Sequence, residues 1–358
     1  MALTGVFPHL GERVPEGRLR LVSCPCGLLQ LDRTFPPDLL YGSTYGYRSG
    51  LNASMVSSLY RTYQNLVEKV PLTEGDAVLD IGCSDGTFLG FFPPFIAKYG
   101  VDPLVAKFLK HIPPTVQATT GFFKAADFSG ARFKLVTAMA MFYDLDDPLE
   151  FLEEVKSVLA DDGYLYVEQL DAEAMLRNTG YDSICHEHLT YFTWKRMVEL
   201  AKDVGLYLVS RDMRHTNGGS HGLLFGRKKV GWTLSGGEIF KHQLEGFSAL
   251  VHQHRLKLWG QIQQAKKPLA GLGASTKGNV ILQWCRLSQD EVPVVLDVNK
   301  DKYQRHTPGT FIPIRSEADW IDKYKTLLVL PWHFRYFFEL KFQGREVELL
   351  FPLKEVRG

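Results

Sequence analysis

The chain has 358 residues, and its 41 Lys and Arg against 40 Asp and Glu give a formal net charge of +1. Hydrophobic residues make up 45% and charged residues 23%, a balance typical of globular proteins with a buried core. Nucleic acid and anionic membrane surfaces require clustered positive charge, and this chain has no block of like charges. We therefore expect a small-molecule partner, with no nucleic acid and no membrane.

The N-terminus and the cysteines predict a cytoplasmic protein. Residues 1–13 lack the cationic start and apolar run of a secretory signal, and no apolar stretch of about 20 residues could span a bilayer. An odd, scattered set of cysteines in a large chain is typical of reduced thiols. The five are Cys24, Cys26, Cys83, Cys185 and Cys285.

Two segments of the chain alternate short apolar runs with helical stretches, which predicts parallel sheets covered by helices. In the first, helices are expected at 53–69 and 151–159, and strands at 77–81, 96–101, 133–141 and 164–168. In the second, helices are expected at 238–267, 276–287 and 332–342, and strands at 268–271, 292–297 and 326–330. The predicted fold is a doubly wound α/β domain (66–195), a second Rossmann-like α/β domain (196–358) and a small N-terminal cap (1–65).

A glycine-rich turn follows the first strand of the first α/β segment. Gly82-Cys83-Ser84-Asp85-Gly86 comes directly after the strand that contains Asp80, and a helix is expected to open at Thr87. Glycines permit backbone angles that other residues avoid and let a ligand approach the main chain. Asp102 ends the next strand, where a carboxylate can accept hydrogen bonds from both hydroxyls of a ribose.

The Gly-x-x-x-Gly spacing differs from the Gly-x-Gly-x-x-Gly of dinucleotide-binding proteins, which disfavours a dehydrogenase. The turn resembles the first motif of class I methyltransferases that use S-adenosylmethionine (SAM). That resemblance implies a SAM site formed by Asp80, Gly82, Ser84, Gly86 and Asp102, with Asp127 facing the adenine. The alternative is a turn with a purely structural role in another kind of α/β domain.

Four further strings, in order along nearly the whole chain, resemble the nucleotide-sugar C-methyltransferases. These strings are Tyr45-Gly46-Tyr47-Arg48-Ser49-Gly50, Cys185-His186-Glu187-His188-Leu189-Thr190-Tyr191-Phe192, Asn217-Gly218-Gly219-Ser220 and Gly271-Leu272-Gly273-Ala274-Ser275-Thr276-Lys277-Gly278-Asn279. Enzymes of that family methylate a carbon of a 4-keto-6-deoxy sugar carried on a nucleoside diphosphate. The resemblance implies a SAM-binding domain at 66–195 and a nucleotide-sugar-binding domain at 196–358.

Carbon becomes nucleophilic when a base removes a proton beside a ketone, and histidine suits that task near neutral pH. Following the family, we expect His188 to be the base, with Glu187 orienting it or contacting the sugar. Tyr47, or less favourably Tyr45, would donate to the keto oxygen, and His186 would support the site. From spacing alone, the two histidines could equally cap a helix or pair in a core, and no third ligand supports a metal site.

The second glycine-rich turn, Leu269 to Gly278, would suit the diphosphate of the substrate. Backbone N–H groups at the start of the following helix favour an anion, and Lys277 adds a positive charge. By resemblance, the predicted substrate-binding residues are Tyr45, Asn217, Ser275, Lys277 and Asp297. The alternative is a half-Rossmann unit that holds no ligand.

The chain departs from the family at three places. Cys185 stands where a tyrosine is frequent, Asp144 stands where a histidine is frequent, and only Cys24-Pro25-Cys26 remains of a structural zinc site. We therefore expect no metal. A different sugar, a SAM-dependent O-methyltransferase, or a two-site protein that senses SAM without consuming it remain alternatives to C-methylation.

Overall fold

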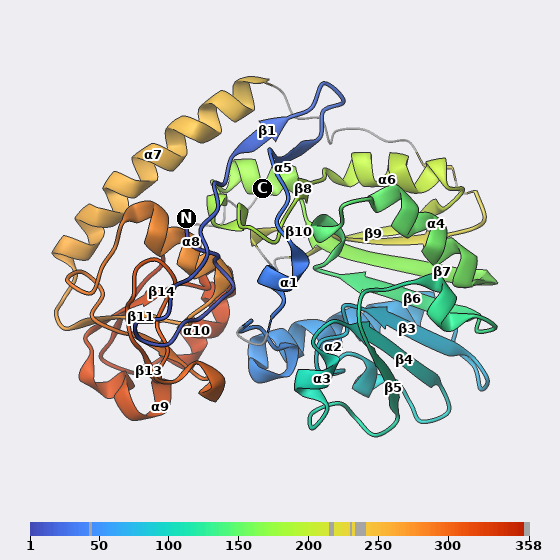
Figure 1. The fold of residues 1–358 in the computed structure, drawn as a ribbon, viewed down its shortest axis with the longest axis horizontal. Helices are drawn as coiled ribbons and strands as arrows, with labels where there is room; N and C mark the ends of the chain where they lie inside the picture. The colour runs from blue at the N-terminus through green and yellow to red at the C-terminus, as the bar shows by residue number, and fades with distance from the viewer. Residues whose placement is uncertain (43–44, 215–217, 230, 233–240, 354–358) are drawn as a thin grey trace.

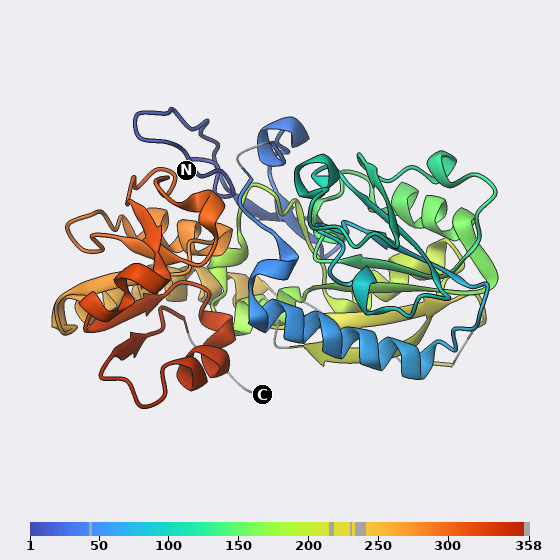
Figure 2. The same ribbon diagram turned by 90° about the horizontal axis from the view of Figure 1, so that it is seen from below.

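The computed structural model describes residues 1–42, 45–214, 218–229, 231–232 and 241–353. Two mainly parallel sheets stand side by side, and the N-terminal segment runs between them (Figure 1). Figure 2 gives the same arrangement from below, with the long helix α2 lying along the larger sheet. The predicted combination of two α/β units with an N-terminal cap is confirmed.

The larger sheet has seven strands in the order β5-β4-β3-β6-β7-β10-β9. The first five are parallel, whereas β10 runs antiparallel to both of its neighbours. The central strands are buried on both faces, which explains why they read as continuous apolar runs in the sequence. Their bounds are β3 Ala77–Ile81, β4 Ala97–Asp102, β5 Val116–Thr120, β6 Phe133–Met139, β7 Leu159–Leu170, β9 Tyr207–Arg214 and β10 Ser220–Gly226.

Helices cover this sheet, and α4, α5 and α6 each begin after a residue whose side chain caps the helix. The Asp147 carboxylate accepts from the backbone N–H groups of Leu149 and Glu150, and Pro148 occupies the first turn of α4. No helix of the described ranges combines the length and apolarity that a membrane crossing requires. The helices of this part are α2 Ala53–Lys69, α3 Val105–Phe108, α4 Pro148–Val158, α5 Ala172–Arg177 and α6 Trp194–Asp203.

The helix expected to open at Thr87 does not form, so this prediction was wrong. Only a short 3-10 helix, Leu89–Phe91, follows the turn. Pro93 and Pro94 come immediately afterwards, and proline lacks the N–H that a continuing helix needs. The glycine-rich turn therefore has to be held in place by other contacts.

The smaller sheet has five parallel strands in the order β13-β12-β11-β14-β15. The long helix α7 arches over its outer side (Figure 1). The elements are α7 Lys241–Gln264, β11 Leu269–Leu272, α8 Thr276–Cys285, β12 Val295–Asp297, β13 Ile314–Ser316, α9 Glu317–Trp320, β14 Thr326–Val329, α10 Arg335–Lys341 and β15 Glu348–Leu350.

The N-terminal segment is tied to the chain that carries the predicted base. Strands β1 (Leu21–Ser23) and β2 (Leu29–Leu31) form a hairpin, and β2 pairs with β8 (Thr190–Tyr191). The Leu31 N–H donates to the carbonyl of Leu189, next to His188. A short helix, α1 (Pro37–Leu40), then leads toward the tyrosine string at 45–47.

The strands from 207 to 226 complete the seven-stranded sheet, although they lie beyond the predicted boundary at 195/196. We therefore propose that the first α/β domain extends to Gly226. The segment from α5 through the 3-10 helix Tyr181–Ser183 packs against α7 and α8 of the second unit. The chain around His188 consequently lies where the two units meet.

Candidate active site

A cavity of about 1220 Å³ lies between the two sheets. Its walls come from the N-terminal segment, the first unit and the second unit. Cavities for one small ligand typically measure about 300–1,000 Å³, so this one has room for two. The predicted residues Asp80, Gly82, Ser84, Asp102, Glu187, His188, Ser275, Lys277 and Asp297 line it, as do Tyr45 and Tyr47.

The glycine-rich turn forms one end of the cavity. Gly82 and Gly86 have φ angles of +79° and +72°, a region that L side chains rarely adopt. A Cβ at Gly82 would lie 3.2 Å from the side chain of Met141, so glycine also leaves room at this point. Ser84 itself has φ +51°, which folds the turn tightly over the end of β3.

Two carboxylates stand behind this turn. The oxygens of Asp102 accept from the backbone N–H groups of Ser84, at 3.0 Å, and Leu104, at 2.7 Å. Each oxygen keeps a further lone pair for a ribose hydroxyl. Asp80 accepts from the Thr137 hydroxyl at 2.6 Å, and burial raises the pKa of Asp80 to about 7.

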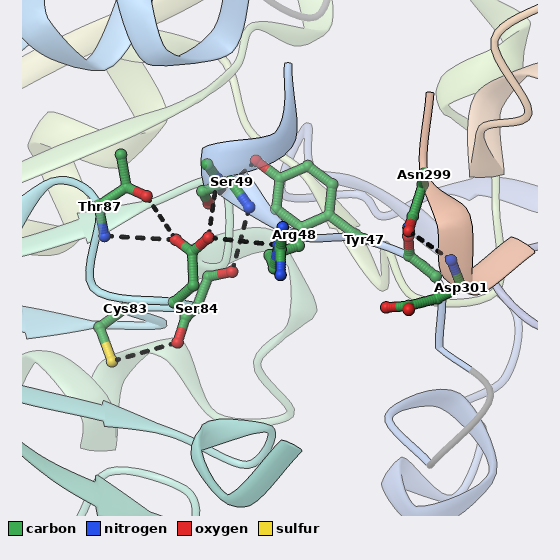
Figure 3. Close-up of polar contacts among 11 residues, drawn as sticks. Tyr47, Arg48, Ser49, Cys83, Ser84, Thr87, Asn299 and Asp301 are labelled. Atoms are coloured by element: carbon green, nitrogen blue, oxygen red, sulfur yellow. Dashed lines mark hydrogen bonds and ion pairs between the residues drawn. The ribbon is translucent and has the colours of Figure 1, made fainter. Parts of the chain in front are cut away.

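Residues 48–50 clamp the turn from the opposite side (Figure 3). The Ser49 N–H donates to the Ser84 hydroxyl at 3.3 Å, and the Gly50 N–H donates to Asp85 Oδ2 at 3.0 Å. Arg48 Nε lies 3.6 Å from the same Asp85 oxygen, and both side chains are largely buried. These contacts hold the turn in the place where the expected helix is missing.

Asp127, predicted to face the adenine, does not line the cavity. It lies on the 3-10 helix Ala125–Phe128, several residues beyond the end of β5, and is exposed. Phe122 lines the wall instead and packs edge-on against Tyr41, with ring centroids 6.4 Å apart. The role of Asp127 at the adenine stays a prediction, and in this structure its side chain lies apart from the cavity.

His188 lines the cavity as an uncharged ring. Its Nδ1 lies 2.8 Å from the Ser183 carbonyl oxygen, and since a carbonyl only accepts, Nδ1 carries the proton. The lone pair is therefore on Nε2. Burial, followed by the positive charge of Lys277, lowers the pKa of His188 to about 3. The Tyr143 ring, with its centroid 4.1 Å away, fixes the imidazole plane.

Glu187 and Tyr45 meet on the wall beside His188. The Thr4 hydroxyl donates to Glu187 Oε2 at 3.3 Å, and burial raises the pKa of Glu187. A Cβ at Gly5 would lie 2.2 Å from Glu187 Oε1 and 3.0 Å from the Tyr45 ring, so glycine is required here. Burial and the Glu187 charge raise the pKa of Tyr45, which keeps its phenol protonated.

Tyr47 occupies the other side of the cavity, toward the glycine-rich turn. Its hydroxyl accepts from Ser49 at 3.2 Å, and desolvation raises its pKa to about 12. The charges that raise this pKa further are those of Asp85, Asp102 and Glu168. Tyr45, rather than Tyr47, therefore lies among the residues around the predicted base.

His186 points away from the cavity. It is fully buried, with Nε2 3.3 Å from the Gly17 carbonyl and the Phe35 ring edge-on at 4.8 Å. Burial lowers its pKa to about 4. In the structure this residue packs against the N-terminal segment and does not line the cavity, and its supporting role in catalysis stays a prediction.

The second glycine-rich turn brings Ser275 and Lys277 to the cavity. Ser275 Oγ caps α8 by accepting from the Gly278 N–H at 3.0 Å. Lys277 donates to the Ser183 hydroxyl at 3.0 Å, and burial lowers its pKa. Lys277 thus lies against the segment that carries His188. The predicted Asn217 lies outside the described residues.

Asp297 and Asn299 follow β12 at the same edge of the sheet. Asp297 accepts from the Asn299 N–H at 2.7 Å, and Lys302 lies 3.8 Å from its other oxygen. Asn299 donates to the Gly46 carbonyl at 3.2 Å and accepts from the Asp301 N–H at 3.0 Å, the second of these contacts being drawn in Figure 3. The second unit therefore positions the loop that holds Tyr45 and Tyr47.

Arg48 and Glu168 are among the residues of the cavity wall to which sequence reasoning gave no role. Arg48 stood inside a recognised motif and Glu168 ends a predicted strand, so each carried a local signal. His333 lies in the 3-10 helix Trp332–Phe334, before α10, and lines the same wall. Burial and the Lys277 charge lower the pKa of His333, and its Nδ1 has no hydrogen-bond partner among the described residues.

No group of three or more His, Cys, Asp or Glu side chains within the described ranges could hold a metal ion. Cys24 and Cys26 lie together in the turn of the N-terminal hairpin, with their sulfurs 2.7 Å apart. The loss of a structural zinc site in this chain stays a prediction.

Two family profiles match the chain. Residues 55–211 match a family described as "Methyltransferase domain", and residues 240–345 match one described as "C-methyltransferase C-terminal domain". The C-methyltransferase NovU of Streptomyces niveus is 28% identical over an alignment of 335 residues, which covers 86% of this chain and 79% of NovU.

Solved structures resemble about half of the chain. A SAM-dependent methyltransferase from Aquifex aeolicus covers 48% of this chain and 97% of its own length, at 17% identity and a TM-score of 0.37. A TehB-like SAM-dependent methyltransferase from Corynebacterium glutamicum covers 49% and 100%, at 17% identity and a TM-score of 0.34. These likenesses are too weak to add to the argument.

The seven-stranded sheet, the glycine-rich turn with Asp102 and the family profiles define a SAM-dependent methyltransferase. The second unit of this enzyme is a C-methyltransferase C-terminal domain. The buried turn with its positive φ angles and the Asp102 carboxylate suit the nucleoside of SAM.

Replacing Asp102 by Ala should weaken binding of S-adenosylhomocysteine, the demethylated product, about 10- to 100-fold. The variant removes both a carboxylate acceptor and the anchor of the turn, and hydrogen bonds to charged groups contribute about 1.5–3 kcal/mol. Isothermal calorimetry provides the measurement. Asp127→Ala is the matched control and should bind as the wild type does; an equal loss in both variants would contradict the assignment.

Replacing His186 by Gln should make the protein less sensitive to acid. The folded-state pKa of His186 is about 4, below the usual value of 6.5, so the unfolded state binds the extra proton between these pH values. Wild-type stability should fall as pH drops below 6.5, with His186 costing about 1 kcal/mol at pH 5.5.

Urea unfolding at pH 7.5 and 5.5 measures this difference for both proteins. His186→Gln should also keep its methyltransferase activity at pH 7.5, because the side chain does not face the cavity. An inactive but folded variant would support the catalytic role predicted for His186.

Proposed function

We propose that this enzyme transfers the methyl group of SAM to a carbon beside the carbonyl of a 4-keto deoxy sugar linked to a nucleoside diphosphate. The observation that carries the proposal is the position of His188. Its ring is uncharged, its proton is fixed on Nδ1, and it lines a cavity whose two ends are glycine-rich turns. A neutral imidazole with a free lone pair is a suitable base.

SAM supplies an electrophilic methyl group on a sulfonium. In the proposed reaction, His188 Nε2 takes a proton from the carbon beside the substrate carbonyl. The C–H electron pair becomes a C=C bond, and the carbonyl π pair moves to the oxygen, giving an enolate. The C=C π pair of the enolate then forms the bond between the substrate carbon and the methyl carbon, while a pair on oxygen re-forms the carbonyl. The S–CH₃ bond breaks, and its electrons stay on sulfur.

The positive charge of Lys277 supports this role for His188. It favours negative charge on a nearby substrate, and so favours formation of the enolate. Burial, together with this charge, also lowers the pKa of His188, so the ring is uncharged before it takes the proton. The contact of Lys277 with the Ser183 hydroxyl places this charge at the junction of the two units. The diphosphate would then lie along the turn that contains Ser275, with Asp297 contacting the nucleotide.

The similarity to NovU and to the C-methyltransferase C-terminal domain supports carbon as the acceptor. Room for two ligands in one cavity supports a substrate as large as a nucleotide sugar, and the near-neutral overall charge agrees with a small-molecule partner. Tyr45 and Glu187, on the wall beside His188, would contact the sugar.

The proposal predicts proton exchange that depends on His188. In deuterated water, the wild type with S-adenosylhomocysteine should introduce deuterium beside the ketone of thymidine- or uridine-diphosphate-linked 4-keto-6-deoxyglucose. His188→Asn should lose this exchange and about 10²–10⁴-fold in kcat. Mass spectrometry of the recovered sugar measures the exchange.

The His188→Asn variant should bind S-adenosylhomocysteine with unchanged affinity. Loss of turnover with retained binding of this product distinguishes an enzyme from a protein that only senses SAM. Methyl transfer to a sugar hydroxyl without any exchange would favour an O-methyltransferase. Neither exchange nor transfer with a panel of keto sugars would contradict the proposal.

A further inference from the structure

Asp144 is a cavity residue that the proposed reaction has not used. It ends the 3-10 helix Phe142–Asp144, which follows the carboxyl end of the central strand β6. Asp144 lines the cavity there. The Tyr41 hydroxyl donates to its Oδ2 at 2.8 Å. Its Oδ1 is buried and has no hydrogen-bond partner among the described residues. A carboxyl oxygen in that position is available to a ligand in the cavity.

Within the described part of the chain, the groups that act on Asp144 are the Tyr41 hydroxyl, as a hydrogen-bond donor, and the charge of Glu187. Tyr41 and Tyr45 face it from the N-terminal segment, and burial raises the pKa of both. The remaining titratable neighbours are Tyr143, Cys185, Glu187 and Tyr191, and burial raises the pKa of each of them as well.

This environment keeps Asp144 in its acid form. Burial, and then the charge of Glu187, raise the pKa of Asp144 well above its usual value. Tyr41 occupies Oδ2 as a donor, so the proton of the neutral acid belongs on Oδ1. Asp144 thus presents a buried O–H group rather than a negative charge.

We propose that the Asp144 carboxyl group donates a hydrogen bond from Oδ1 to the carbonyl oxygen of the acceptor and stabilises the negative charge that forms there. This inference rests on the proposed function, because it assigns a residue to the enolate that His188 would generate. The proton stays on Asp144 throughout, since the oxygen loses its negative charge when the neighbouring carbon bonds to the methyl group. Donors placed where charge develops are a major source of catalysis in dry sites.

Geometry favours Asp144 over Tyr47 for this role. Tyr47 lies on the side of the glycine-rich turn, near Asp85 and Asp102, where the methyl donor would bind. Asp144 lies beside Tyr45 and Glu187, on the wall that adjoins His188. A base and an oxygen donor on the same wall are what enolisation of a ketone requires.

Comparing the variants Asp144→Asn and Asp144→Ala shows whether Asp144 acts as a neutral hydrogen-bond donor or as a carboxylate. The amide of Asn can accept from Tyr41 and point its N–H into the cavity, so Asp144→Asn should keep kcat within about tenfold of wild type. Asp144→Ala has no donor and should lose about 10²–10³-fold in kcat. The substrate is the 4-keto-6-deoxyglucose nucleotide that the wild type turns over, and Asp127→Asn serves as the exposed control.

The pH profile adds a readout that a packing role would not change. Wild-type kcat should fall as pH rises through the pKa of Asp144, and Asp144→Asn should lack this alkaline decline. If Asp144→Asn is as inactive as Asp144→Ala while both bind S-adenosylhomocysteine normally, the inference is overturned, because Asp144 then acts as a carboxylate.

Infrared difference spectroscopy of wild type against Asp144→Asn tests the protonation state without any sugar. At neutral pH the wild type should contribute the C=O band of a carboxylic acid that shifts in deuterated water. A carboxylate band instead would overturn the inference even if the enzyme methylates keto sugars. If the acid band is present but no keto sugar is turned over, the proposed reaction fails, and with it the assigned role of Asp144.

Discussion

The contact between residues 48–50 and Asp85 determines the shape of the methyl-donor site. In this chain Pro93 and Pro94 prevent a long helix after the glycine-rich turn, so the turn lacks the support of such a helix. The Gly50 N–H and the Arg48 guanidinium hold the Asp85 carboxylate, while Thr87 donates to its second oxygen from within the turn. The same string carries Tyr45 and Tyr47, and Asn299 holds it from the second unit. One short segment thus joins the donor site to the acceptor site.

Burial of titratable groups is the second constraint. Around the acceptor end of the cavity, desolvation keeps His188 uncharged and keeps Asp144 and Tyr45 protonated. Lys277 lies against the same wall and adds a positive charge there. The sequence had already indicated this residue as a binding residue. A site with neutral hydrogen-bond donors, an uncharged base and the positive charge of Lys277 is suited to forming an anion on the substrate.

Much of the fold followed from the sequence, because buried parallel strands leave continuous apolar runs and the helix at 53–69 has a regular apolar face. The helix after Gly86 was mispredicted because its proline stop was overlooked. The strands at 207–226 were not predicted, and the sequence does not indicate that they join the first sheet. That is decided by antiparallel pairing with β7, a long-range contact.

The sequence indicates the position of a site residue where a motif fixes the backbone, but not the packing of a side chain, which depends on the fold. Gly82, Ser84 and Asp102 lie at the turn and strand end that their spacing implied. His186 and His188 are equivalent by spacing, yet one packs against Phe35 and the other lines the cavity. The sequence marked Asp144 as a departure from the family, but only the fold places it beside Tyr41 and Glu187.

The central claim is that one cavity holds the methyl donor at the glycine-rich turn and the acceptor between His188 and Lys277. A crystal structure of the enzyme with S-adenosylhomocysteine and thymidine or uridine diphosphate tests it most directly. The account predicts the ribose of the nucleoside at Asp102 and the diphosphate along the turn that contains Ser275, in the same cavity. Density for either molecule outside this cavity, or a ribose away from Asp102, would contradict it.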